Sequence, residues 1–166
     1  MHRLTHRTAR RHPMRLLELK VPPLLLTAVF AALIFGARAA WPRAVLPLPG
    51  HRVAAAVLGG AGLALLLGAA LQFRRARTTL DPRDPARATR FVAAGLYRFT
   101  RNPMYLGMAL VLLGAAAWTA QAVALLLVAV FVAWLTAWQI RPEERALAER
   151  FGASYTDYTR RVRRWL

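Results

Sequence analysis

Four long apolar runs alternate with polar, arginine-rich segments along the chain. They cover residues 21–37, 53–73, 104–119 and 122–140, and none of them contains a charged side chain. A helix needs about 20 apolar residues to cross the hydrocarbon core of a bilayer, with a range of about 17–25. The pattern therefore predicts an all-α, polytopic membrane protein with four transmembrane helices and a polar C-terminal segment.

The connections between the runs differ in length and character. The first, residues 38–52, contains Trp41 and three prolines and is typical of a turn at the membrane interface. The third, residues 119–121, has room only for a tight turn, so the last two runs should form an antiparallel hairpin. Several glycines lie in the second run, which favours close contact with another helix.

Charge gives the predicted orientation. The 166-residue chain is 57% hydrophobic and carries 24 Lys and Arg residues for a net charge of +17. Only Arg38, Arg43 and Arg52 lie in the first connection, and the other basic residues fall in the N-terminal tail, the 74–101 segment and the C-terminal segment. Because basic segments stay in the cytoplasm, we expect both termini there, in what we take to be a bacterial inner membrane. Arginines that flank apolar runs favour anionic lipids over nucleic acid as the partner.

Composition also limits the chemistry. The absence of cysteine excludes disulfides, thiolate metal sites and a thiol nucleophile. His2, His6 and His12 are scattered over a basic tail, so no metal site is predicted. That tail, residues 1–20, has no small-residue cleavage site after a short apolar core and is not expected to be a signal peptide. Residues 21–166 are expected to form one domain.

The first candidate constellation lies where the 74–101 segment meets the third apolar run. Asn102 is a good helix N-cap and Pro103 suits the first helical position, so a helix should begin there, with Tyr105 in its first turn. Unpaired N–H groups at such a helix start suit an anion. A well-capped membrane helix with interfacial aromatic residues is the simpler interpretation.

The second constellation lies where the fourth run ends. Glu143 and Glu144 are two of only seven acids in the chain, and Pro142 before them can begin a helix. Beyond them, apolar and aromatic residues recur at helical spacing on one face: Leu147, Phe151, Tyr155, Tyr158, Val162 and Trp165. An amphipathic helix on the bilayer surface, which Gly152 divides in two, explains that face without any ligand.

The hairpin should bring the two constellations together. If runs three and four are antiparallel neighbours, Tyr105 and Glu143 lie at the same bilayer face and should flank one cavity. Paired carboxylates, tyrosines and arginines beside a helix start suit a zwitterionic or cationic polar ligand. The spacing alone does not identify that ligand.

At these residues the chain resembles the integral membrane methyltransferases that include isoprenylcysteine carboxyl methyltransferase and the phospholipid N-methyltransferases. The resemblance covers about residues 74–166. It rests on an ordered set of short motifs: Thr78-Thr79-Leu80-Asp81-Pro82, Phe91-Val92 with Gly95-Leu96-Tyr97, Arg101-Asn102-Pro103-Met104-Tyr105-Leu106-Gly107, and Glu143-Glu144 with Leu147, Phe151-Gly152, Tyr155, Tyr158, Val162 and Arg164.

The resemblance implies S-adenosylmethionine as methyl donor and a lipophilic acceptor, with the site at the cytoplasmic face. The positions that bind the cofactor in that family correspond here to Phe91, Val92, Tyr97, Asn102, Pro103, Met104, Tyr105 and Glu143. The catalytic residues are not identified, and Arg101, Glu144 and Arg141 are the candidates. The prenylcysteine enzymes have His at the position of Asn102, and a substrate-binding Arg at that of Gln139, for which nearby Arg141 is a candidate substitute.

Three functions remain open at this point. The first is a methyltransferase of the isoprenylcysteine type, with a phospholipid N-methyltransferase as its close alternative. The second is a non-enzymatic membrane protein that binds anionic lipid through its basic face. The third is a small nicotinamide-dependent membrane reductase, which the short chain disfavours because no extended nucleotide-binding segment is present.

Overall fold

The computed structural model describes residues 19–75 and 92–166, and within these ranges every regular element is a helix. In chain order the elements are α1 (Pro23–Ala40), α2 (His51–Arg75), the 3₁₀ turn η3 (Gly95–Arg98), α3 (Pro103–Thr119), α4 (Ala122–Leu135), the π-helical turn η4 (Thr136–Ile140), α5 (Arg141–Phe151) and α6 (Ala153–Arg161). The all-α prediction is confirmed for this part of the chain. Residues 1–18, including the histidine-bearing part of the basic tail, lie outside it.

Three helices are long and apolar enough to cross a membrane: α1, α2 and the continuous helix Ala122–Phe151. α3 contains no charged residue but is only 17 residues long, so four spans remain a prediction. Large apolar side chains point outward from the three longer helices, among them Leu24, Leu67 and Leu126, which are 63%, 65% and 63% exposed. Such surfaces are stable when lipid covers them.

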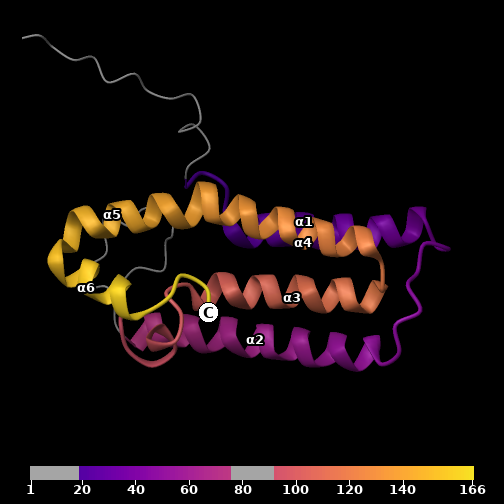
Figure 1. The fold of residues 1–166 in the computed structure, drawn as a ribbon, viewed down its shortest axis with the longest axis horizontal. Helices are drawn as coiled ribbons and strands as arrows, with labels where there is room; N and C mark the ends of the chain where they lie inside the picture. Colours follow the sequence, from indigo (N-terminus) through magenta and orange to yellow (C-terminus); the bar gives the residue numbers. More distant parts are fainter. Residues whose placement is uncertain (1–18, 76–91) are drawn as a thin grey trace, which may run out of the picture.

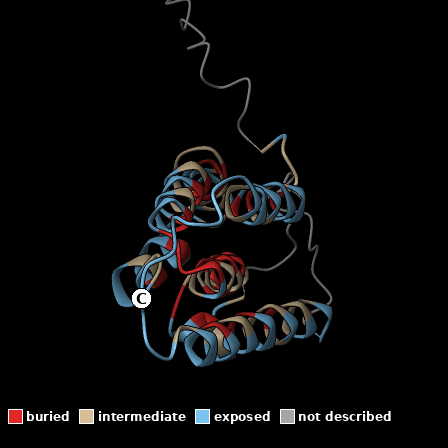
Figure 2. Cartoon of the chain, turned by 90° about the vertical axis from the view of Figure 1, so that its right-hand side faces the viewer, coloured by how far each residue is buried: buried red, intermediate tan, exposed pale blue. Residues whose placement is uncertain are grey.

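α3 is the central helix of the bundle. It contacts α2 on one side and both α1 and α4 on the other (Figure 1). Seen along the bundle, buried positions concentrate on this helix, while the outer faces of α1 and α2 are mostly exposed (Figure 2). Its side chains Met108 and Leu112 are buried in one core with Ile34 and Phe131.

Glycines bring α2 and α3 unusually close. A Cβ at Gly62 would lie 2.7 Å from the Gly107 carbonyl oxygen, and one at Gly114 would lie 2.8 Å from the backbone nitrogen of Gly59. Helices that approach this closely leave no room for a side chain at the contact. The predicted role of glycine is confirmed at Gly62, whereas a Cβ at Gly60 would meet nothing within 4 Å.

The hairpin between α3 and α4 is as tight as predicted. Ala120 ends α3 in the left-handed conformation, with φ 49° and ψ 43°, and its N–H donates to the carbonyls of Ala116 and Ala117. At the same end of the bundle, the Gln121 amide donates to the Trp41 carbonyl at 2.8 Å. The other end, where α3 begins and α5 follows α4, is called the site end below.

Pro142 lies in the first turn of α5, as the sequence allowed, but α5 is not a separate helix. The helix continues from α4 through η4 into α5 without a break. A proline cannot donate the hydrogen bond that the carbonyl four residues earlier expects, which here is that of Trp138. The chain forms a π turn at this point, and the Leu19 N–H donates to the Trp138 carbonyl at 3.1 Å.

The C-terminal face forms as two helices rather than one. Gly152 separates α5 from α6 with φ +54°, as the sequence suggested. Tyr155, Tyr158 and Val162 are buried together, packed against Leu147 and Phe151. Trp165, the last member of the predicted face, packs instead against the main core, because the helix ends at Arg161 and the chain beyond it is non-helical.

Candidate active site

The site end is built first from the short segment that leads into α3. η3 begins at Gly95, whose φ of +58° favours glycine, and a Cβ there would collide with the Gln72 side chain of α2. The Gln72 side chain accepts a hydrogen bond from the Leu96 N–H at 3.2 Å. This anchors the segment to the end of α2 and places buried Tyr97 edge-on against Phe73, with ring centroids 5.3 Å apart.

α3 begins at Pro103, as predicted, but Asn102 does not cap it with its side chain. The Asn102 amide instead donates to the carbonyl of Arg164 at 2.8 Å, and the hydroxyl of Thr100 donates to the same carbonyl at 3.3 Å. An amide turned outward to the C-terminal chain cannot also reach the first N–H groups of its own helix. Asn102 is therefore a buried link between the start of α3 and the end of the chain.

Tyr105 and Glu143 meet across the hairpin. The Tyr105 hydroxyl donates to Oε2 of Glu143 at 2.9 Å, although 38 residues separate them. Gln139, fully buried and one turn before Glu143, also hydrogen-bonds Tyr105. The two constellations thus face one another through a direct contact between Tyr105 and Glu143.

Glu144 lies between two arginines. Arg164 binds its carboxylate through Nε at 3.1 and 3.2 Å and through an Nη atom at 2.7 Å, and Arg101 approaches the other edge at 3.2 Å. The hydrogen bonds to Glu144 raise the pKa of the Arg164 guanidinium. Both Arg101 and Glu144 are largely buried, with 14% and 15% of their side chains exposed, so this is more than a surface ion pair.

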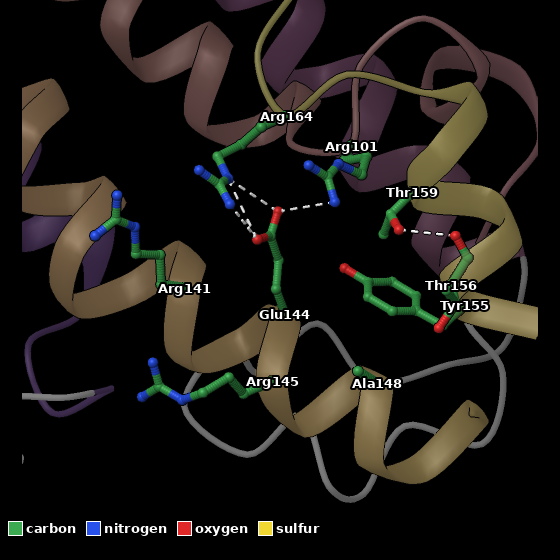
Figure 3. A pocket seen from close by; sticks show the side chains of 9 residues that line it. All are labelled: Arg101, Arg141, Glu144, Arg145, Ala148, Tyr155, Thr156, Thr159 and Arg164. Atoms are coloured by element: carbon green, nitrogen blue, oxygen red, sulfur yellow. Dashed lines mark hydrogen bonds and ion pairs between the residues drawn. The ribbon is translucent and has the colours of Figure 1, made fainter. Parts of the chain in front are cut away.

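A cleft of about 400 Å³ opens beside these ion pairs (Figure 3). Nine residues from the α3 entry, α5, α6 and the C-terminal segment line it: Arg101, Arg141, Glu144, Arg145, Ala148, Tyr155, Thr156, Thr159 and Arg164. Its volume is within the range of about 300–1,000 Å³ typical of small-molecule sites. All three candidate catalytic residues line it, whereas Glu143 and Tyr105 lie next to it without lining it.

Tyrosines from two elements support the cleft. The Tyr158 hydroxyl donates to the Tyr97 carbonyl at 2.7 Å, which ties α6 to η3. Burial raises the pKa of Tyr158 to about 12, against a partial lowering by Arg101, and burial also raises the pKa values of Tyr97 and Tyr155. These phenols are therefore neutral hydrogen-bonding groups at physiological pH.

The other residues predicted to bind a cofactor lie either at the start of α3 or in the segment before η3. Pro103 is buried at the start of α3 and Met104 is half-buried beside it. Val92 is half-buried near η3, and Phe91 lies outside the described residues. In the described part of the chain, no group of His, Cys, Asp or Glu residues could hold a metal ion.

Two residues that help to hold the site end together were not among the predicted site residues. They are Arg164, which binds Glu144, and Thr100, which donates to the Arg164 carbonyl. The one signal in the sequence was the position of Arg164 at the end of the C-terminal motif. Its partner could not be inferred, because the non-helical chain after α6 decides where that side chain reaches.

Comparisons with known proteins identify a family for this chain. Residues 51–154, from the start of α2 into α6, match the phospholipid methyltransferase family. An uncharacterized protein of Haemophilus influenzae is 40% identical over 63 residues, which are 38% of this chain and 100% of that protein. No solved structure matches the chain. Because the family match covers more than half of the chain, including Tyr105 and Glu143, the protein belongs to the phospholipid methyltransferase family of membrane methyltransferases.

Proposed function

We propose that this protein transfers a methyl group from S-adenosylmethionine to a lipophilic acceptor at the cytoplasmic membrane face. The observation that carries the proposal is the meeting of Tyr105 and Glu143 across the hairpin, beside a cleft that both flanking segments line. The family match indicates methyl transfer, and this meeting supports one composite site for it.

The residues at the site end fit the chemistry of that cofactor. Nε of Arg101 is buried without a hydrogen-bond partner among the described residues, and its guanidinium suits the cofactor's carboxylate. The Glu143 carboxylate suits its ammonium group, and the face of Tyr155 suits a cation. The proposed binding set is that of the resemblance: Phe91, Val92, Tyr97, Asn102, Pro103, Met104, Tyr105 and Glu143, with Arg101 added.

The protein's own part is alignment and exclusion of water. When bound, the cofactor supplies a methyl group already activated by its positive sulfur, so the chain mainly has to hold the acceptor in line with it. The buried Tyr105, Gln139 and Pro103 exclude water from one side of the site. No acid or base among the described residues is assigned to the transfer.

The exposed edge of the cleft supports an acceptor with an anionic group. Arg141 and Arg145, one turn apart on α5, line that edge, and the cleft as a whole has four arginines and one glutamate. A lipid phosphate or carboxylate would be attracted there, while its chain extends toward the apolar faces of the bundle. Phospholipid acceptors and prenylated carboxylates both meet this description.

The test is incubation of the purified protein with methyl-labelled S-adenosylmethionine and a total lipid extract, followed by identification of the labelled product. Calorimetry on Glu143→Gln should show cofactor affinity reduced by about tenfold to a hundredfold, which is the loss of one charge-assisted contact worth about 1.5–3 kcal/mol. Glu149→Gln is the matched control, since Glu149 lies on the same helix with an exposed side chain that does not line the cleft.

Other outcomes identify the alternatives. Wild-type protein that binds anionic lipid vesicles but neither binds the cofactor nor labels any lipid would be a lipid-binding membrane protein instead. Binding of a nicotinamide cofactor in its place would indicate a reductase. Equal affinity in wild type and Glu143→Gln would remove Glu143 from the site.

A further inference from the structure

The last five residues of the chain cross the site end as a non-helical strap. α6 ends at Arg161, Val162 has extended backbone angles of φ −120° and ψ 130°, and the chain bends at residues 162 and 164. We call residues 162–166 the C-terminal strap. In Figure 1 the strap runs from α6 back to the start of α3, and its Arg164 is one of the residues that line the cleft.

The backbone of the strap holds the entry to α3. The Arg101 N–H donates to the Arg163 carbonyl at 2.9 Å, and the Arg164 carbonyl accepts from Asn102 and Thr100. Beyond them, Trp165 packs against the main core. These contacts fix the position of the strap independently of the Arg164 side chain.

The Arg164 side chain then determines how the charges in the cleft are paired. Glu144 accepts three contacts of 2.7–3.2 Å from Arg164 and one of 3.2 Å from Arg101 (Figure 3). Two cations share one carboxylate, so the group has one positive charge in excess. Because Arg164 occupies both oxygens of Glu144, the positive charge of Arg101 is only partly neutralised.

We propose that Arg164 is a positioning residue, which engages Glu144 so that Arg101 can bind an anionic group of the ligand. This rests on the proposed function, with the cofactor's carboxylate as that group. Without Arg164, Glu144 would pair with Arg101 alone, and the ligand would have to compete with an internal carboxylate. Arg101 lines the cleft, and its Nε is buried without a hydrogen-bond partner among the described residues, so Glu144 does not use the full hydrogen-bonding capacity of this guanidinium.

The experiment is a calorimetric titration of S-adenosylmethionine into four proteins: wild type, Arg164→Ala, Arg164→Lys and the double variant Glu144→Ala with Arg164→Ala. Arg164→Ala should bind about tenfold more weakly than wild type, because Glu144 then competes with the ligand for Arg101. Arg164→Lys should recover part of that loss, because it keeps the charge without the bidentate geometry. The double variant should bind more tightly than Arg164→Ala alone, since removal of Glu144 frees Arg101.

Arg163→Ala is the matched control, because the exposed Arg163 side chain lies on the same strap outside the cleft lining. Hydrogen exchange of residues 99–106, compared between Arg164→Ala and wild type, reports whether the strap has detached. Exchange should stay slow, since the backbone contacts remain.

A double variant that binds no more tightly than Arg164→Ala would overturn the positioning role and leave Arg164 as a structural tie. Unchanged affinity in Arg164→Ala would overturn it as well. Wild type that does not bind the cofactor at all is a different result, which rejects the proposed function itself.

Discussion

Tyr158 shows how single side chains set the chemistry of the site end. The residue is 6% exposed, and its hydroxyl donates to the Tyr97 carbonyl rather than to a charged group. A phenol held in this way stays protonated, because its anion would lose hydration and face the negative end of a carbonyl. Neutral tyrosines leave the charges of the site to its carboxylates and arginines.

Alkaline pH should therefore weaken the fold through these phenols. The pKa of Tyr158 is about 12 in the folded protein against an ordinary value of 10.0, so the folded protein binds more protons between these values. Stability that is complete below pH 10 is then lost as the pH rises toward 12. Thermal unfolding in detergent between about pH 9 and 12 should show this decline, with a shallower slope for Tyr158→Phe.

The slope is the informative quantity, because Tyr158→Phe also loses a hydrogen bond and starts from a lower stability. Tyr155→Phe is a comparison with a second phenol of raised pKa. A slope identical to wild type in Tyr158→Phe would mean that this phenol titrates normally in the folded protein.

Some contacts of single side chains could be predicted from the sequence, and others could not. The approach of Tyr105 to Glu143 followed from a three-residue turn, since antiparallel neighbours must bring their ends together. The partner of Asn102 was mispredicted, because the residue type favours a helix cap and the competing acceptor lies 62 residues away. Contacts of this kind depend on the tertiary path of the C-terminal chain.

At the scale of helices, the contact between α2 and α3 depends on glycines, which have no side chain to separate the two backbones. Gly62 and Gly107 bring the two backbones so close that a methyl group on either would meet a carbonyl oxygen at 2.7–2.8 Å. Backbone atoms cannot move aside as a flexible side chain can. The site depends on this contact, because Gln72 at the end of α2 holds the segment that enters α3.

Gly62→Ala should destabilise the protein by about 1–3 kcal/mol, the usual cost of overpacking a close contact. Gly60→Ala is the matched control on the same helix, since a Cβ there meets nothing within 4 Å. That control should be neutral or stabilising by up to about 1 kcal/mol, because alanine favours helix more than glycine. Thermal unfolding in one detergent measures both, and equal stabilities of the two variants would contradict the close contact.

The helices were well predicted from the sequence, and their interruption poorly. The first three charge-free runs predicted the ends of α1, α2 and α3 to within a few residues, whereas the helix of the fourth run continues beyond residue 140 to Phe151. The π turn was not foreseen, since a proline at residue 142 is compatible both with a new helix and with a bulged one. Burial of Gln139 and the Leu19 contact to Trp138 favour continuity, and both are tertiary contacts.

For the whole molecule, the site lies at one end of the bundle and the tight hairpin at the other. If the basic segments lie in the cytoplasm, the cleft opens on that side, where soluble cofactors are available. Lipid acceptors would reach it from the surrounding bilayer. The orientation of the bundle in the membrane therefore decides whether the cleft can receive a cofactor from the cytoplasm.

Orientation can be tested directly, because the chain has no native cysteine to interfere. In intact cells, Ala153→Cys should resist an impermeant maleimide. Leu48→Cys, in the connection between α1 and α2 at the other end of the bundle, should react. Permeabilised cells should label both positions. Reaction of Ala153→Cys in intact cells would invert the topology and move the site to the outer face.

The π turn η4 also has a consequence for how such a site can be altered. A π turn contains one residue more than an α-helical turn, and each residue of an α-helix turns the chain by about 100°. The π turn therefore takes up one residue without changing the direction in which the residues beyond 140 point, including the two acids. Deleting Ala137 would convert it to an α-helical turn and leave the acidic pair facing Tyr105 and Arg101, whereas an alanine inserted into the regular helix α4 would rotate the pair by about 100°. Loss of one codon is thus tolerated at this turn, while gain of one elsewhere in the same membrane helix would separate the two halves of the site.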